Sequence, residues 1–219
     1  MSQYVLDLGH RPALGRGDFI VAPGNAQAVE WLDRWPHWPG PGLVLAGPPG
    51  SGKSHLLAAF AARHHGRLTE AEDLTIASVP EVVEQAPLIL VDDVTAAADQ
   101  AALFHLHNLV VQSGKSMVFA MSKPPIHMGF DLPDWSSRAA ALPLAEISEP
   151  DDALLGAVMI KQFADRQVTV APELIAYLLG RMERSFAEAG RIVDVLDRAA
   201  LERGQAITVP LARKILDGF

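Results

Sequence analysis

The sequence has no cysteine, no long apolar run and no excess of positive charge. The lack of cysteine excludes disulfide bonds and thiolate metal sites, and it fits a cytoplasmic protein. Charges or prolines interrupt every apolar run, and no basic stretch with an apolar core opens the chain, so we expect neither a membrane span nor a secretory signal. The net charge of −8 argues against strong direct DNA binding, because displacing the counterions of DNA requires a positive surface.

The composition is that of an ordinary globular protein. Of the 219 residues, 49% are hydrophobic and 20% are charged. This length is enough for one large domain, or for a core domain with a smaller appendage.

Short apolar runs alternate with stripes of apolar residues at helical spacing in the first two thirds of the chain. We expect strands at 43–46, 88–91 and 117–121, and helices at 25–35, 54–64 and 101–112. Strands that alternate with helices predict a parallel sheet covered on both faces.

The pattern changes after about residue 147. The following segments all have helical periodicity, with no long strand among them: 152–166, 172–182, 183–202 and 210–216. We therefore expect a flexible N-terminal segment at 1–17, an α/β nucleotide-binding domain at 18–148 and a helical domain at 149–219.

The residues Gly47–Ser54 satisfy the P-loop pattern G-x-x-x-x-G-K-[ST]. Gly50 and Gly52 let the backbone curl so that its N–H groups face a phosphate, and the next helix adds its positive end. Lys53 would reach the β- and γ-phosphates, and the Ser54 hydroxyl would ligate Mg²⁺. A Gly/Pro turn that fits by chance is the alternative, but the apolar strand before the loop and the amphipathic helix after it favour a P-loop.

Two aspartates, Asp92 and Asp93, follow directly after the expected strand 88–91. Asp92 lies 39 residues after Lys53. Asp92 would hold Mg²⁺ through its water shell, and Asp93 would orient an attacking water. The alternative is that the two carboxylates begin a turn. Together with the P-loop, they predict a site for ATP or ADP with Mg²⁺.

At these residues the sequence resembles the bacterial initiator DnaA and its shorter relatives, the Hda family of replication regulators. The likeness lies in the segments 19–25, 47–56, 92–93, 103–108 with 114–115, and 196–199. It implies a P-loop AAA+ core, in which helices flank a parallel sheet, followed by a helical lid domain.

The resemblance also implies which residues contact the nucleotide. The segment around Ile20 would pack against the adenine, and ADP is the form in which the family functions. The implied nucleotide contacts are Ile20, Val21, Asn25, Pro49, Gly50, Ser51, Gly52, Lys53, Ser54 and His55.

Two features resemble the regulator more than the initiator. The chain ends soon after the lid, which leaves no room for the initiator's C-terminal DNA-binding domain. It also begins with Gln3–Leu8, which resembles a sliding-clamp-binding peptide of the form Q-x-x-L-x-L. Gln3 would hydrogen-bond at a pocket rim while Leu6 and Leu8 fill apolar pockets. A tail or edge strand with alternating apolar residues is the alternative.

Arg138 falls where the family has its arginine finger, and would act on the nucleotide of a partner; a surface salt bridge is the alternative. Lys123 stands where the family usually has a polar sensor residue, so we expect weak intrinsic hydrolysis. The lid arginine that senses the γ-phosphate would be Arg184 or Arg191. We place both on one helix, where either could instead pair with a neighbouring carboxylate.

The resemblance thus implies a negative regulator of replication initiation that binds the sliding clamp and stimulates ATP hydrolysis by DnaA. In that role it is an activator of a partner's ATPase more than an enzyme, and assembly as a homodimer stays open. The alternatives are a helicase-loading or transposition-helper AAA+ ATPase that acts on nucleic acid, a stand-alone ATPase, and a nucleotide-stabilised adaptor.

Overall fold

The computed structural model describes residue 21 and residues 23–216. They form two compact units, one ending at Ser148 and the other beginning at Glu149. Within this described part, no helix is long and apolar enough to cross a membrane. The two units are taken separately below.

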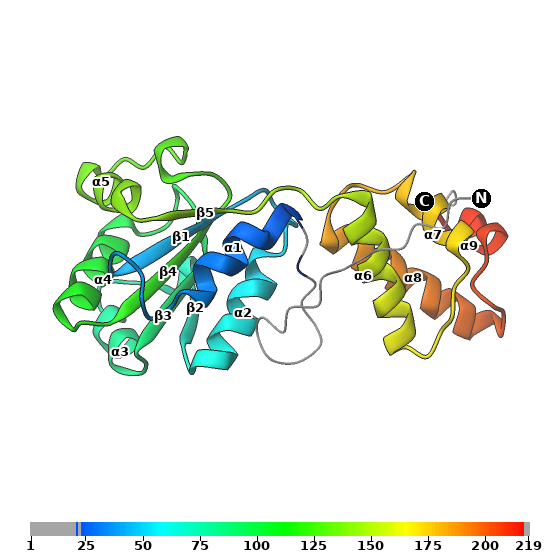
Figure 1. The fold of residues 1–219 in the computed structure, drawn as a ribbon, viewed down its shortest axis with the longest axis horizontal. Coiled ribbons are helices and arrows are strands. Elements are labelled where there is room, and N and C mark those ends of the chain that lie inside the picture. The colour runs from blue at the N-terminus through cyan, green and yellow to red at the C-terminus, as the bar shows by residue number, and fades with distance from the viewer. Residues whose placement is uncertain (1–20, 22, 217–219) are drawn as a thin grey trace. The chain divides into compact units, whose positions relative to one another are not determined.

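The first unit is built on a five-stranded parallel sheet with the order β2-β3-β4-β1-β5 (Figure 1). Its strands are β1 (Gly42–Ala46), β2 (Arg67–Glu70), β3 (Leu88–Val94), β4 (Ser116–Met121) and β5 (Leu144–Glu146). The strands β1 and β4 are almost entirely apolar, which fits the burial of both of their faces. The predicted parallel α/β sheet is confirmed.

Helices cover both faces of this sheet. The helices α1 (Pro23–Asp33) and α2 (Lys53–His64) pack on one face, while α3 (Val79–Glu84), α4 (Gln100–Gln112) and α5 (Pro133–Ala141) pack on the other. Two short 3₁₀ helices, η1 (Ala71–Asp73) and η2 (Pro125–His127), lie in the connections. The start of α4 is fixed locally, because the side chain of Asp99 accepts a hydrogen bond from the Ala102 N–H at 3.0 Å.

Four elements of this unit were not expected from the sequence: β2, β5, α3 and α5. The strands β2 and β5 are short edge strands, with four and three residues, so their apolar alternation is too brief to be seen. The helix α5 begins at Pro133, ahead of Arg138. Proline fits the first turn of a helix, where its missing N–H costs nothing.

The second unit is entirely helical in its described residues, as predicted for the lid domain. It contains α6 (Asp152–Asp165), α7 (Pro172–Leu179), α8 (Phe186–Arg203) and α9 (Val209–Leu216). Leu155, Phe163, Leu178 and Leu196 are fully buried in its separate core.

The boundary of α8 corrects one expectation. Ser185 has an extended backbone and caps the helix, accepting the N–H of Glu188 at 3.0 Å. Arg184 therefore precedes α8, whereas Arg191 lies on it, so the two arginines do not share a helix. The capping serine is visible in the sequence, but the helical periodicity extends past it.

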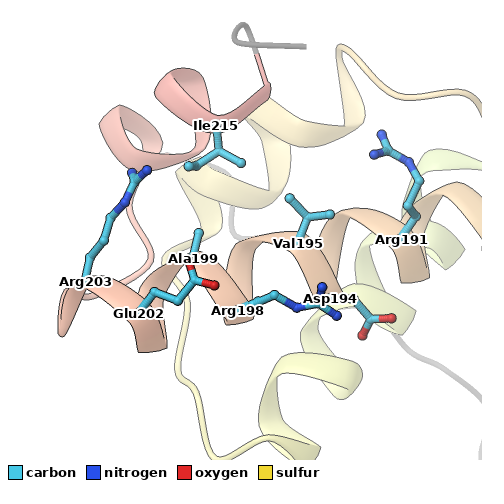
Figure 2. A pocket seen from close by; sticks show the side chains of 8 residues that line it. All are labelled: Arg191, Asp194, Val195, Arg198, Ala199, Glu202, Arg203 and Ile215. Carbon is cyan, nitrogen blue, oxygen red and sulfur yellow. The ribbon is translucent and has the colours of Figure 1, made fainter.

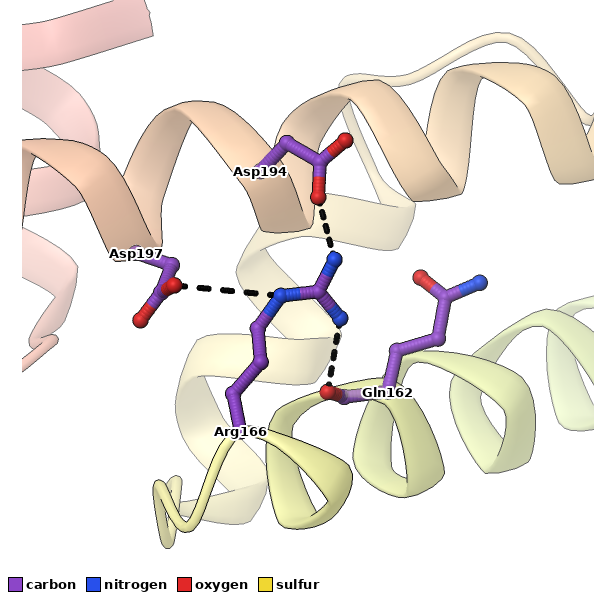
Figure 3. A network of polar contacts seen from close by, with 4 residues as sticks. All are labelled: Gln162, Arg166, Asp194 and Asp197. Atoms are coloured by element: carbon purple, nitrogen blue, oxygen red, sulfur yellow. Dashed lines mark hydrogen bonds and ion pairs between the residues drawn. The ribbon is translucent and has the colours of Figure 1, made fainter.

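Arg166, which follows the last residue of α6, ties that helix to α8 (Figure 3). Its guanidinium donates to Asp194 and to the carbonyl of Gln162, and its Nε lies 3.8 Å from an oxygen of Asp197. One cation thus offsets the charge of two carboxylates on neighbouring turns of α8. This leaves Asp194 engaged within the second unit.

Trp135 anchors α5 to the sheet, since it is fully buried and its ring lies 5.0 Å from that of Phe119 and 5.8 Å from that of Phe130. We expect Trp135→Ala to lower the free energy of unfolding by about 3–5 kcal/mol, because it opens a cavity under α5. Trp135→Phe should cost less, because it keeps a ring and the Trp135 Nε1 has no hydrogen-bond partner among the described residues. Urea denaturation of the full chain measures both. Equal losses in the two variants would contradict the view that packing of the aromatic ring anchors α5.

Candidate nucleotide site

The site lies at the carboxyl edge of the parallel sheet. The P-loop follows β1, Ser122 and Lys123 follow β4, and Asp92 and Asp93 lie near the end of β3. The order β3-β4-β1 brings these three strand ends side by side (Figure 1). Ligands of open α/β sheets bind in the crevice outside such strand ends.

Backbone hydrogen bonds hold the entry to the P-loop. The Gly47 N–H donates to Met121 O at 3.1 Å, and the Ile147 N–H donates to Ala46 O at 2.7 Å. A Cβ on Gly47 would lie 2.5 Å from Ile147 O, so only glycine fits where the loop leaves the sheet. The two strands that flank β1 thus fix the direction in which the loop leaves it.

The turn of the loop requires glycine at two further positions. Gly50 has φ of 72° and Gly52 has φ of 92°, which side chains rarely adopt. Gly52 stands immediately before α2 and accepts the Leu56 N–H at 2.9 Å. The N–H groups of the first turn of α2 are therefore presented at the loop, as an anion requires.

The side chain of Lys53 lies against the P-loop, where it would contact the phosphates. Its Nζ donates to the carbonyls of Gly47 at 2.6 Å and Pro48 at 2.9 Å. Burial lowers the pKa of its amino group, while the carboxylates of Asp92 and Asp93 act in the opposite direction. The lysine is thus within electrostatic reach of both aspartates, and a phosphate would add further negative charge beside it.

Ser51 shows that the loop fits a phosphate. Its side chain is only 3% exposed, and its Oγ has no hydrogen-bond partner among the described residues. A buried hydroxyl without a partner is costly, and a phosphate oxygen could satisfy it.

The two aspartates have different environments. Asp92 is 5% exposed, and its Oδ1 accepts the Asp93 N–H at 2.8 Å. Asp93 is exposed and has φ of 49° at an irregularity in the register of β3, a backbone conformation that is uncommon outside glycine. The structure thus holds one carboxylate rigidly and turns the other outward.

The oxygens of Ser54 and Asp92 fit Mg²⁺, which takes one or two protein oxygens and completes its shell with water and phosphate. No cluster of three or more acidic or histidine side chains that could cage a metal occurs in the described ranges. The P-loop serine and the Asp92 carboxylate are the residues that would hold the ion.

Glu70 is a neighbour of the site that the sequence did not reveal. It pairs in register with Asp92 across β2 and β3. Loss of solvent around its carboxyl, followed by the charges of Asp92 and Asp93, raises its pKa. Its position depends on the pairing of β2 with β3, and β2 is too short to be recognised in the sequence. The only sequence signal for Glu70 is a carboxylate at the end of that short strand.

The residues expected around the adenine lie partly within the described chain. The Ser148 N–H donates to Gly24 O at 2.9 Å, which ties the first turn of α1 to the segment after β5 that also contacts Gly47. Asn25 is buried in this turn, and Val21 packs against the core between α1, α2 and the sheet. Pro49 and His55 are exposed on the P-loop and the first turn of α2.

Other expected contacts lie outside the described residues. They are Ile20 and the clamp-binding residues Gln3, Leu6 and Leu8.

Arg138 lies on the opposite side of the sheet from α2. Trp135 and Ala139 bury the inner face of α5, while Arg138 is exposed and makes no hydrogen bond or ion pair with any described residue. Its charge reaches His107 on α4, where burial first and then Arg138 lower the pKa of the imidazole. It is not among the charges that shift the pKa of Lys53.

The structure shows the surroundings of the three residues expected at the sensor positions. Lys123 is exposed after β4, next to Ser122, whose hydroxyl donates to Met128 Sδ at 3.8 Å. Arg184 bonds Asp152 at 2.9 and 3.2 Å, and Arg191 bonds Glu188 through two 2.7 Å contacts. Both lid arginines are therefore held by carboxylates of their own unit.

Comparisons with known proteins agree with this architecture. Residues 152–216 match the Hda lid domain family. An uncharacterised protein of Haemophilus influenzae is 27% identical over 190 residues, which cover 81% of this chain and 82% of that protein.

Solved structures share the fold. Domain III of the replication initiation protein DnaA from Thermotoga maritima aligns with a TM-score of 0.79 and 19% identity, covering 92% of this chain and 95% of that one. AMPPCP-bound DnaA from Aquifex aeolicus gives 0.70 and 22%, covering 84% and 65%. The RuvB Holliday junction branch migration motor of Thermotoga maritima gives 0.66 and 15%, covering 80% and 61%.

The five-stranded sheet, the P-loop at its carboxyl edge and the helical second unit form the fold that these solved structures share. The chain thus has the fold of DnaA domain III, and its second unit matches the Hda lid domain.

Lys53 gives the most direct test of the site. We expect Lys53→Met to weaken the binding of a fluorescent adenine nucleotide by roughly 10- to 100-fold, because a charge-assisted contact to phosphate is lost. Titration followed by fluorescence measures the affinity. Lys115→Met is the control, because that lysine also donates to backbone carbonyls but precedes β4, at the opposite edge of the sheet. A similar loss in both variants would contradict the assigned site.

Proposed function

We propose that this protein is a negative regulator of replication initiation, which binds adenine nucleotide at its P-loop and promotes ATP hydrolysis by DnaA. The placement of Arg138 carries the proposal. An exposed guanidinium without a partner among the described residues, on the face of the sheet opposite α2, is suited to the nucleotide of another protein. The Hda lid match and the fold of DnaA domain III support the choice of partner.

The nucleotide itself is proposed to be ADP or ATP with Mg²⁺. The Aquifex DnaA of the same fold binds AMPPCP, an adenine nucleotide. Here the N–H groups at the start of α2 would hold the phosphates, with Lys53 adding its charge and Ser51 its buried hydroxyl. Val21 and Asn25 would lie beside the base, and Ser54 and Asp92 would hold the ion. Bound Mg²⁺ would neutralise phosphate charge.

Intrinsic hydrolysis is proposed to be weak. Asp93 projects outward at the edge of the site, where it could orient a water, but the neighbouring strand end presents Lys123 in place of a polar sensor. The two lid arginines, Arg184 and Arg191, are engaged by Asp152 and Glu188. On this proposal the chain's own nucleotide stabilises its structure more than it supplies turnover.

Action in trans requires charge and geometry that only arginine offers. A guanidinium stays protonated and donates two parallel hydrogen bonds to phosphate oxygens, so it stabilises charge as it develops in phosphoryl transfer. Trp135 and Ala139 hold α5 rigidly, which would present Arg138 in a fixed direction. The sliding clamp would bring the protein to the replication machinery through Gln3, Leu6 and Leu8. A homodimer is compatible with the same exposed arginine.

The fold by itself is compatible both with the role of a regulator and with that of a motor. RuvB, described as a Holliday junction branch migration motor, shares it. The net charge of −8 favours a protein partner over nucleic acid, since direct DNA binding needs a positive face.

Arg138→Ala tests the mechanism in a mixture with ATP-bound DnaA. We expect the variant to lose about 10³-fold or more of the stimulated rate of ATP hydrolysis, because the transition-state charge is left without its donor. Arg138→Lys should recover little, since lysine lacks the bidentate geometry. Arg67→Ala is the matched control, because Arg67 is also exposed and makes no ion pair with a described residue. Full stimulation by Arg138→Ala would favour an adaptor without catalytic consequence.

Binding to the purified sliding clamp tests the tether separately. The triple variant Gln3→Ala, Leu6→Ala, Leu8→Ala should lose the binding shown by the unaltered chain, because both the rim hydrogen bond and the apolar anchors are removed. Surface plasmon resonance with immobilised clamp gives the two dissociation constants. Equal constants would assign the attachment to another surface, and no binding by either chain would remove the clamp from the proposal.

A further inference from the structure

A groove lies between α8 and α9 in the second unit. It is a hollow of about 440 Å³. Its centre is apolar, with Val195, Ala199 and Ile215, and Arg191, Arg198 and Arg203 add positive charge along it (Figure 2). We call this the α8–α9 groove.

The arrangement follows from the helical period of α8. Residues at spacings of three and four share a face, so Arg191, Val195, Arg198 and Ala199 lie along one stripe of the helix. Figure 2 shows Arg191 and Arg203 at opposite ends, with the apolar side chains between them. Arg203 lies twelve positions after Arg191 on α8, a distance of about 18 Å along the helix axis.

The charges of the groove are unequally compensated. Arg191 is held by Glu188, and Asp194 is engaged by Arg166. Arg198 and Arg203, by contrast, make no hydrogen bond or ion pair with any described residue, and Glu202 is the remaining acid of the lining. The groove therefore has an excess of uncompensated positive charge beside a partly buried apolar strip.

We propose that the α8–α9 groove binds an extended acidic segment of a protein partner, in which carboxylates flank one or two apolar side chains. The carboxylates would pair with Arg198 and Arg203, and the apolar side chains would cover Val195 and Ile215. An extended chain rises about 3.3 Å per residue, so about six residues span the groove. The apolar centre favours a peptide over nucleic acid, because no aromatic side chain of the lining offers a surface for stacking bases.

Fluorescein-labelled Asp-Glu-Leu-Leu-Glu-Asp tests the proposal by fluorescence anisotropy with the full chain. We expect it to bind at least about tenfold more tightly than Asp-Glu-Gly-Gly-Glu-Asp, which has the charge without the apolar centre, and than Lys-Lys-Leu-Leu-Lys-Lys. Equal binding of the two acidic peptides would reduce the effect to charge attraction and overturn the proposal. So would undetectable binding of the first peptide, or tighter binding of an oligothymidine of similar charge.

Charge reversal locates the binding. The double variant Arg198→Glu, Arg203→Glu should lose the first peptide, and Val195→Ser should weaken it without any change of charge. Arg181→Glu is the control, since this arginine is exposed in the same unit and stacks on Tyr177, away from the lining. Circular dichroism checks that each variant is folded. Unchanged peptide affinity in the folded double variant, or an equal loss in the control, would overturn the assignment.

Discussion

The site depends on a few backbone hydrogen bonds at the carboxyl end of β1. Gly47 is bound to the end of β4, Ala46 to Ile147, and Gly24 to Ser148. These bonds join the P-loop, the end of β4 and the first turn of α1 in one rigid frame. The strand β4 lies next to β3, which carries Asp92 and Asp93. Because the strands are parallel and neighbouring, their ends cannot separate without breaking the sheet.

This frame explains why the residues around it can remain polar and partly unsatisfied. The buried hydroxyl of Ser51 has no hydrogen-bond partner in the described part of the chain, Asp93 has a left-handed backbone, and Lys53 is partly desolvated. Each of these features costs free energy, which the apolar cores on both faces of the sheet offset. Their concentration at one edge is typical of a binding site.

The outer faces of the two units are organised in a similar way. In the first unit, Trp135 is buried so that Arg138 on the same helix projects outward without a partner among the described residues. In the second, the inner face of α8 packs in the core while its outer face presents Arg198 beside Val195. In both cases an amphipathic helix fixes the direction of a cation, so each surface is suited to a partner's negative charge.

The sequence by itself determined the P-loop, the aspartate pair, the parallel sheet and the helical second unit, because each has a local pattern. A glycine in a tight turn, an apolar strand and a helical stripe are all read over a few neighbouring residues. Tertiary structure decided the rest. Glu70 reaches Asp92 only through the pairing of a short edge strand, and α5 gains its stability from the burial of Trp135. Arg184 is separated from Arg191 by a capping serine and paired with Asp152 on another helix. Such contacts join residues far apart in the chain, so no local pattern contains them.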